Sequence, residues 1–161
     1  MSTTGLPPCG LYKTLAAIGE IPAGRLVYFH NHGDPGPGVY FPASWSHNRA
    51  TFSERGSTLP THFDVRALRP LPAEGFYRVA KQFVCCAKKC ATFEPDMLVQ
   101  LGYNGAGQAL VFIPELAGGT IGVPDRGTPV DDTALGNLTL LKLPERKVDP
   151  TIALPRGILV H

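Results

Sequence analysis

The chain contains one sequence pattern twice, and this repeat constrains the fold more than any other feature. Residues 6–13 (LPPCGLYK) and 71–78 (LPAEGFYR) share a leucine, a proline, a glycine, a tyrosine and a basic residue. Several matches in one order at offsets of about 65–72 indicate an internal duplication. The further matches, at offsets of 71 or 72, pair 26–27 with 98–99, 39–42 with 111–114, 54–57 with 125–128 and 68–72 with 140–144.

The duplication predicts two modules, one over residues 10–73 and one over residues 74–146. Modules of this size bury little surface and are only marginally stable alone, so we expect them to pack against each other or against a partner. The second module carries seven extra residues after its tyrosine, which places a cysteine-containing insertion at 82–93. Segments 1–9 and 147–161 lie outside the modules and are predicted to be extended, proline-rich terminal arms.

Glycine (18 residues) and proline (16 residues) interrupt almost every long segment of the chain. Both residues terminate helices, so short strands joined by turns are favoured and the chain is predicted to be all-β. The clearest strand pairs are 26–30 with 39–41 and 98–101 with 109–113, each separated by a glycine-rich turn. Several short strands in about 65 residues resemble a small SH3-like barrel, and we therefore predict a tandem pair of such barrels.

Comparison of the two copies also predicts which face of the second strand is buried. Alternate side chains of a strand share a face. The positions of Val27 and Phe29 are apolar in both copies, whereas the positions of Tyr28 and His30 match residues of different character. We expect the first pair to lie in the core and the second pair to be more exposed.

Charge and hydropathy exclude several classes of function. The formal net charge is +2 and charged residues make up 17% of the chain. Because phosphate binding needs a basic surface, nucleic acid is not an expected partner, although exposed aromatic rings could stack on bases. No apolar run approaches the roughly 18 residues of a membrane span, and the N-terminus lacks the features of a secretion signal. We expect a cytoplasmic protein, or one incorporated in a particle, with its four cysteines as thiols.

Three of those cysteines, Cys85, Cys86 and Cys90, lie in the predicted insertion. They could supply thiolates to zinc, with Cys9 or a histidine as the fourth ligand. The usual C-x-x-C spacing is absent, and a disulfide between Cys86 and Cys90 is a second alternative. The interpretation as plain thiols is favoured, since cysteine is readily buried as a small apolar residue. Two neighbouring lysines are expected to lower the pKa of an adjacent thiol.

His30 and His32 could chelate a metal together with His47 or Asp34. The favoured interpretation is again simpler, because paired surface histidines are mostly solvated. No resident metal and no cofactor are therefore predicted.

The sequence offers no convincing catalytic arrangement. Ser44 and His47 are close in sequence, but a nucleophile and its base meet through the fold rather than through adjacency. Neither a G-x-S-x-G elbow nor a phosphate-binding loop is present. The protein is therefore predicted not to be an enzyme.

The sequence predicts a non-enzymatic structural or assembly protein that acts through contacts with other protein subunits, either copies of itself or a second protein. A component of a phage- or virion-like particle is the favoured form. The alternative is a soluble bacterial binding or regulatory module that recognises a peptide or small ligand between the barrels. Aromatic and arginine side chains are typical of interface hot spots. The predicted interface residues are Tyr28, His30, Tyr40, Trp45 and Arg49.

Overall fold

The computed structural model describes residues 6–32 and 36–144. The predicted arm 147–161 lies outside these residues, as do the first five residues of the predicted arm 1–9. The described part of the chain is all-β apart from two short 3-10 helices. None of its helices is long and apolar enough to cross a membrane.

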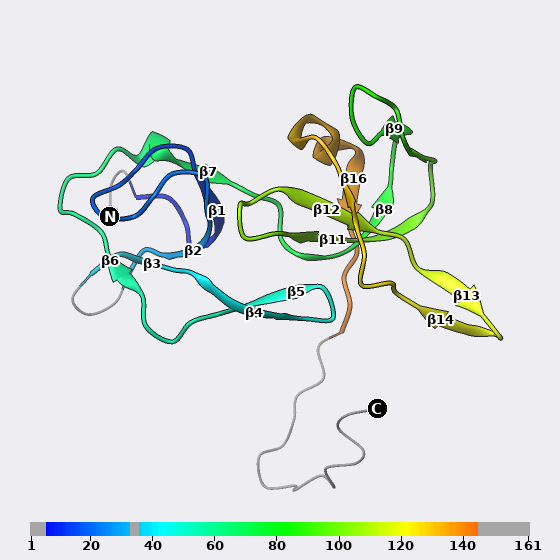
Figure 1. Ribbon diagram of the computed structural model, residues 1–161, viewed down its shortest axis with the longest axis horizontal. Coiled ribbons are helices and arrows are strands. Elements are labelled where there is room, and N and C mark those ends of the chain that lie inside the picture. The colour runs from blue at the N-terminus through cyan, green and yellow to red at the C-terminus, as the bar shows by residue number, and fades with distance from the viewer. Residues whose placement is uncertain (1–5, 33–35, 145–161) are drawn as a thin grey trace, which may run out of the picture.

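Two five-stranded antiparallel sheets form the two halves of the described chain (Figure 1). The first sheet contains β1 (Gly10–Thr14), β2 (Leu26–His30), β3 (Gly38–Tyr40), β6 (Ser57–Thr58) and β7 (Leu68–Pro70). The second contains β8 (Gly75–Val79), β11 (Leu98–Tyr103), β12 (Ala109–Phe112), β15 (Thr128–Pro129) and β16 (Leu138–Leu140). The strand orders, β6-β3-β2-β1-β7 and β15-β12-β11-β8-β16, are equivalent. A 3-10 helix precedes the last strand in each half, η1 (Val65–Ala67) and η2 (Asp132–Asn137).

Three further hairpins lie outside the two sheets. One, β4 (Pro42–Ser46) with β5 (Arg49–Phe52), follows β3, and its counterpart, β13 (Glu115–Ala117) with β14 (Thr120–Gly122), follows β12. The third, β9 (Phe83–Val84) with β10 (Thr92–Phe93), occupies the predicted insertion.

The repeated sequence motif forms the same local structure in both halves. Gly10 and Gly75 have φ angles of 154° and 148°, a backbone conformation that residues with a Cβ rarely adopt. Two residues later, the Tyr12 hydroxyl donates a hydrogen bond to Pro8 O, and the Tyr77 hydroxyl donates one to Ala73 O, both at 2.6 Å. The motif therefore marks the first residues of a strand. Its buried tyrosine forms a hydrogen bond with the backbone of the segment that precedes the strand.

The predicted core positions are confirmed. Val27 and Phe29 in β2 and their counterparts Val99 and Leu101 in β11 are fully buried. The opposite face of the first sheet is not solvated throughout, because Leu26 is fully buried within the core of the second half. The two halves therefore pack against each other, as their small size led us to expect.

The predicted barrels are not confirmed. Within the described residues neither five-stranded sheet closes on itself, because each edge strand pairs with one neighbour only. The edge strands β6 and β15 are two residues long, which is too short to supply the additional ladder that closure needs. The observed architecture is a pair of open, antiparallel sheets with hairpins projecting from them.

Candidate functional site

The β4–β5 hairpin leaves the first sheet and lies against the second half of the chain (Figure 1). Trp45 Nε1 donates a hydrogen bond to Tyr103 O at 2.9 Å, and the Ala50 N–H donates one to Glu74 Oε2 at 3.0 Å. Burial raises the pKa of Glu74 above its usual value, while the Ala50 N–H and the charge of Arg49 partly offset this effect. The hairpin thus covers a carboxylate of the second half and supplies a donor to it.

The turn of this hairpin makes the closest contact. His47 and Asn48 have φ angles of 52° and 65°, as a two-residue type I′ turn requires. Asn48 Nδ2 donates to Gln100 Oε1 at 2.9 Å and to Pro124 O at 2.8 Å, and Gln100 Nε2 donates to His47 O at 2.9 Å. A Cβ at Gly102 would lie 2.7 Å from Asn48 O. This approach is possible because position 102 carries no side chain.

The docked hairpin explains a difference between the two copies. Gln100 and Gly102 are buried, although their counterparts in the first half, Tyr28 and His30, are only partly buried. The prediction that Tyr28 and His30 are more exposed than the core face is therefore confirmed. At the counterpart positions, Gln100 forms hydrogen bonds with the hairpin turn and Gly102 leaves room for it.

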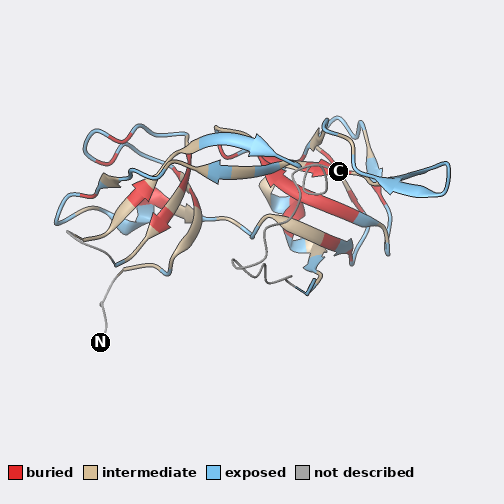
Figure 2. Cartoon of the chain, turned by 90° about the horizontal axis from the view of Figure 1, so that it is seen from below, coloured by how far each residue is buried: buried red, intermediate tan, exposed pale blue. Residues whose placement is uncertain are grey.

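The equivalent hairpin of the second half, β13–β14, contacts solvent instead. It also has a two-residue turn, Gly118–Gly119, with φ angles of 59° and 82°. Every residue of its two strands is exposed (Figure 2), and the apolar side chains of Leu116 and Ile121 are 75% and 63% exposed. An apolar hollow of about 260 Å³ lies at the base of the hairpin. The hollow is lined by Met97, Leu98, Ile113, Pro114, Glu115, Leu116 and Ile121.

The predicted interface residues lie on the first sheet and on the β4–β5 hairpin. Tyr28 and Tyr40 are direct cross-strand neighbours in the first sheet, and Tyr28 packs against Phe52 with ring centroids 5.8 Å apart. Tyr28 and Arg49 line a hollow of about 430 Å³ beside Glu74. Trp45 is engaged within the chain, although 44% of its surface remains exposed.

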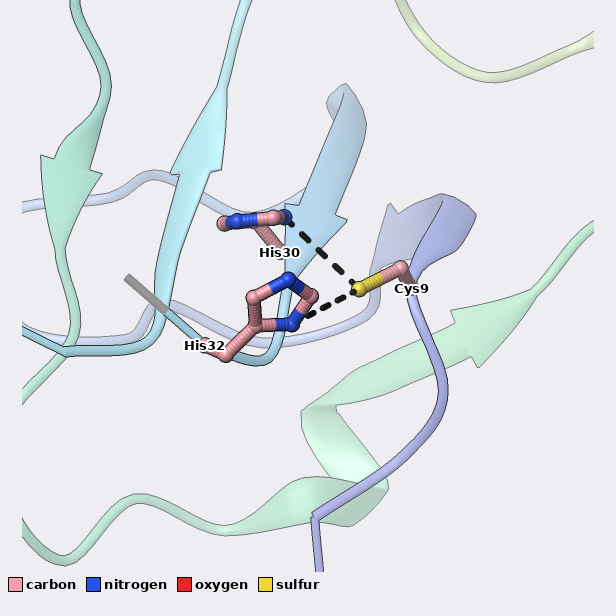
Figure 3. Close-up of side chains that lie close together, drawn as sticks. All are labelled: Cys9, His30 and His32. Carbon is pink, nitrogen blue, oxygen red and sulfur yellow. Dashed lines mark hydrogen bonds between the residues drawn. The ribbon is translucent and has the colours of Figure 1, made fainter.

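The last predicted interface residue, His30, contacts Cys9, which lines the same hollow as Tyr28 and Arg49. It lies beside Cys9 and His32 at the end of β2 (Figure 3). Cys9 Sγ is 3.7 Å from His30 Nδ1 and 3.8 Å from His32 Nδ1, and the two imidazole ring centroids are 4.0 Å apart. Cys9 therefore lies with the histidines of the first half, and not with the thiols of the insertion, for which it was one of two alternative fourth ligands.

The three cysteines of the insertion do lie together. Cys85 is buried, its Sγ accepts a hydrogen bond from the Ala91 N–H at 3.2 Å, and it lies 3.5 Å from Cys86 Sγ. Hydrogen bonds from the Cys85 thiol and the Lys88 backbone N–H lower the pKa of Cys86. The charge and the hydrogen bond of Cys86 raise the pKa of Cys90. The lowering at Cys86 thus comes from hydrogen bonds, and not from lysine side-chain charge as the sequence suggested.

Comparison with known proteins gave no match, whether to a protein family, to a curated protein or to a solved structure.

Sequence reasoning missed both projecting hairpins. The signal for the second was present, since Gly118–Gly119 between short apolar segments is typical of a type I′ hairpin turn. The first has the less obvious turn residues His47–Asn48. The Cys9–His30 contact could have been found from strand register, because antiparallel pairing of Gly10 with Phe29 places the preceding cysteine beside the following histidine.

Replacement of Gly102 tests the docking of the first hairpin. We expect Gly102→Ala to lower the free energy of unfolding by about 1–3 kcal/mol, because the added methyl group overlaps Asn48 O. Gly122→Ala is the matched control, since a Cβ there meets open space and the expected change is within about 0.5 kcal/mol. Urea unfolding measures both. Equal stability of the two variants would contradict the observed docking.

Thiol alkylation tests the pKa order in the insertion. At neutral pH we expect iodoacetamide to modify Cys86 before Cys90, although Cys90 is the more exposed, because the lower pKa gives Cys86 the larger thiolate fraction. Mass spectrometry of timed samples measures the order. The difference should vanish in denaturant, and faster modification of Cys90 in the folded protein would contradict the assignment.

Proposed function

We propose that the protein is a non-enzymatic assembly subunit that binds other protein subunits through its β13–β14 hairpin. The observation that carries this proposal is the contrast between two equivalent hairpins. β4–β5 is docked on the next module along the chain, whereas β13–β14 carries Leu116 and Ile121 into solvent. Such exposed apolar residues on a projecting element are typical of protein–protein contact sites.

The directions of the two hairpins support a contact in which a hairpin of one subunit meets a different surface, a sheet, of the next subunit. β4–β5 runs from the first sheet toward the second, and β13–β14 projects from the second sheet away from the first (Figure 1). Within the chain, a hairpin of one module meets the sheet of the next, so donor and acceptor surfaces differ. Repetition of such a heterologous contact between subunits generates rings or open-ended tubes. This geometry suits a component of a phage- or virion-like particle.

The two halves are further proposed to be diverged, incompletely closed versions of one SH3-like module. Their common strand order and the 3-10 helix before each last strand support a shared origin. Small β-modules of this kind serve many functions, so the fold itself does not favour one activity.

A second candidate function is recognition of a peptide or small ligand by a monomeric protein. It is favoured by the hollow of about 430 Å³ beside the junction of the halves, where Tyr28, Arg49 and Glu74 offer an aromatic face and two opposite charges. The two functions differ in valency, because an assembly subunit forms or joins larger complexes, whereas a recognition module binds one partner.

Hydrodynamic measurement on hairpin variants tests the proposed function. We expect the full-length protein to sediment as an oligomer, or to join a particle from a lysate of its source. Leu116→Asp combined with Ile121→Asp should weaken that association at least about tenfold, since burial of each apolar side chain contributes roughly 1.5–3 kcal/mol. Sedimentation velocity and light scattering over a range of concentrations measure the change.

Leu15→Asp is the matched control, because Leu15 is an apolar residue of the first half that is 50% exposed. We expect it to leave the association unchanged, and circular dichroism should show that all variants keep the fold. A protein that is monomeric at every concentration and joins no particle would contradict the assembly function. It would direct attention to the hollow beside Tyr28.

A further inference from the structure

We propose that Cys9, His30 and His32 form a zinc(II)-binding site at the end of the first sheet, an inference independent of the assembly function. The three donor atoms all lie within 4.8 Å of one another (Figure 3). In a tetrahedral zinc site with Zn–S of about 2.3 Å and Zn–N of about 2.0–2.1 Å, sulfur and nitrogen are about 3.6 Å apart. The observed separations from Cys9 Sγ, 3.7 Å and 3.8 Å, fit that spacing.

The contacts around Cys9 share one orientation of the imidazole rings. Asn31 Oδ1 accepts from the Cys9 thiol at 3.3 Å and lies 2.7 Å from His32 Nδ1. Both histidines direct Nδ1, and not Nε2, toward the same sulfur. One ion that accepts a lone pair from each of the three atoms satisfies this arrangement.

The surroundings are those of a metal ligand set. The Asn31 N–H donates a hydrogen bond to Cys9 Sγ at 3.3 Å, and such contacts orient a thiolate ligand. Asn31 Nδ2 donates to Pro7 O at 3.1 Å, which holds the segment before β1 against the end of β2. His32 Nδ1 also lies 2.7 Å from Asn31 Oδ1, so this nitrogen carries a hydrogen without metal. Zinc binding therefore releases the proton of the Cys9 thiol and requires the His32 ring hydrogen to move from Nδ1 to Nε2.

The backbone brings the ligands together before any ion binds. Antiparallel pairing of Gly10 with Phe29 fixes Cys9 beside His30, and His32 follows two residues later. Cys9 and His30 are half-buried and His32 is exposed, so the three ligands leave a fourth position open to solvent. We assign that position to water.

The site belongs to the first half alone. In the aligned repeat, Glu74 stands at the position of Cys9 and Gly102 at the position of His30. Both residues of the second half contact the β4–β5 hairpin instead. The thiols of the insertion are a separate group, and the experiment must distinguish them.

Cobalt(II) substitution in the full-length chain tests the proposal. Cys86→Ser combined with Cys90→Ser serves as the background, because it removes two of the three thiols of the insertion. We expect this protein to bind one equivalent of cobalt, with a sulfur-to-cobalt charge-transfer band and the visible bands of tetrahedral coordination. Stoichiometric zinc should displace the cobalt and abolish both signals.

Ligand variants in the same background assign the atoms. Cys9→Ser should abolish the charge-transfer band. His30→Ala and His32→Gln should each weaken metal affinity at least about tenfold, a loss that outer-sphere partners alone produce in other sites. His62→Ala, which changes an exposed histidine of the first half, should bind cobalt normally. Urea unfolding without metal verifies that each variant folds.

Three results would overturn the proposal. The background protein could show no charge-transfer band with excess cobalt, or Cys9→Ser could keep the band. The band could also be absent from the background yet present when Cys9→Ser is made in the otherwise unchanged chain, which would place the metal at Cys85, Cys86 and Cys90. If Cys9→Ser disturbs the fold, the metal affinity of His32→Gln still tests the proposal, because His32 is exposed.

Discussion

The contact of the β4–β5 hairpin with the second half is the interaction on which the rest of the structure depends. Five hydrogen bonds that involve side chains join the two, and the tightest approach is made to a glycine. Each half is small, and the open sheets leave edge strands and one face of each sheet to be covered. The hairpin covers one such face, and Leu26 of the first sheet completes the core of the second half. The two modules therefore share an interface and a core cluster.

The equivalent hairpin of the second half, β13–β14, is exposed instead of docked. β13–β14 has the turn type and position of β4–β5, but among the residues that the structure describes it covers no other module. An exposed leucine and an exposed isoleucine on a two-stranded ribbon contribute nothing to the stability of a monomer, because their apolar surface stays in water. An isolated two-stranded hairpin is also marginally stable. Burial against another subunit resolves both problems, and this is the physical reason to connect the hairpin with assembly.

Sequence patterns predicted the duplication, the all-β class, the central strand pairs and the buried positions around Val27 and Phe29. These features follow from local periodicity and from comparison of the two copies, because a character shared by both copies is less often accidental. The open sheets were not predicted, since closure depends on the length of edge strands that the pattern does not define. The docked hairpin was missed because its partners, Gln100 and Gly102, are 52 or more positions from the turn and carry no recognisable motif. The cluster of Cys9, His30 and His32 could be predicted only from the register of the paired strands, and not from the spacing of these residues in the sequence.

The duplication also shows how one position can acquire two uses. In both halves, strand register places the residue before the first strand (β1 or β8) beside the residue that follows the partner of that strand's first glycine. In the second half they are Glu74 and Gly102, a hydrogen-bond acceptor and an opening for the hairpin turn. In the first half they are Cys9 and His30, which converge on each other. The two uses exclude each other, because an imidazole at position 102 would occupy the space of Asn48 O. The first sheet therefore cannot receive a hairpin in the manner of the second. In the proposed assembly, a neighbouring subunit must therefore contact the first sheet in another way.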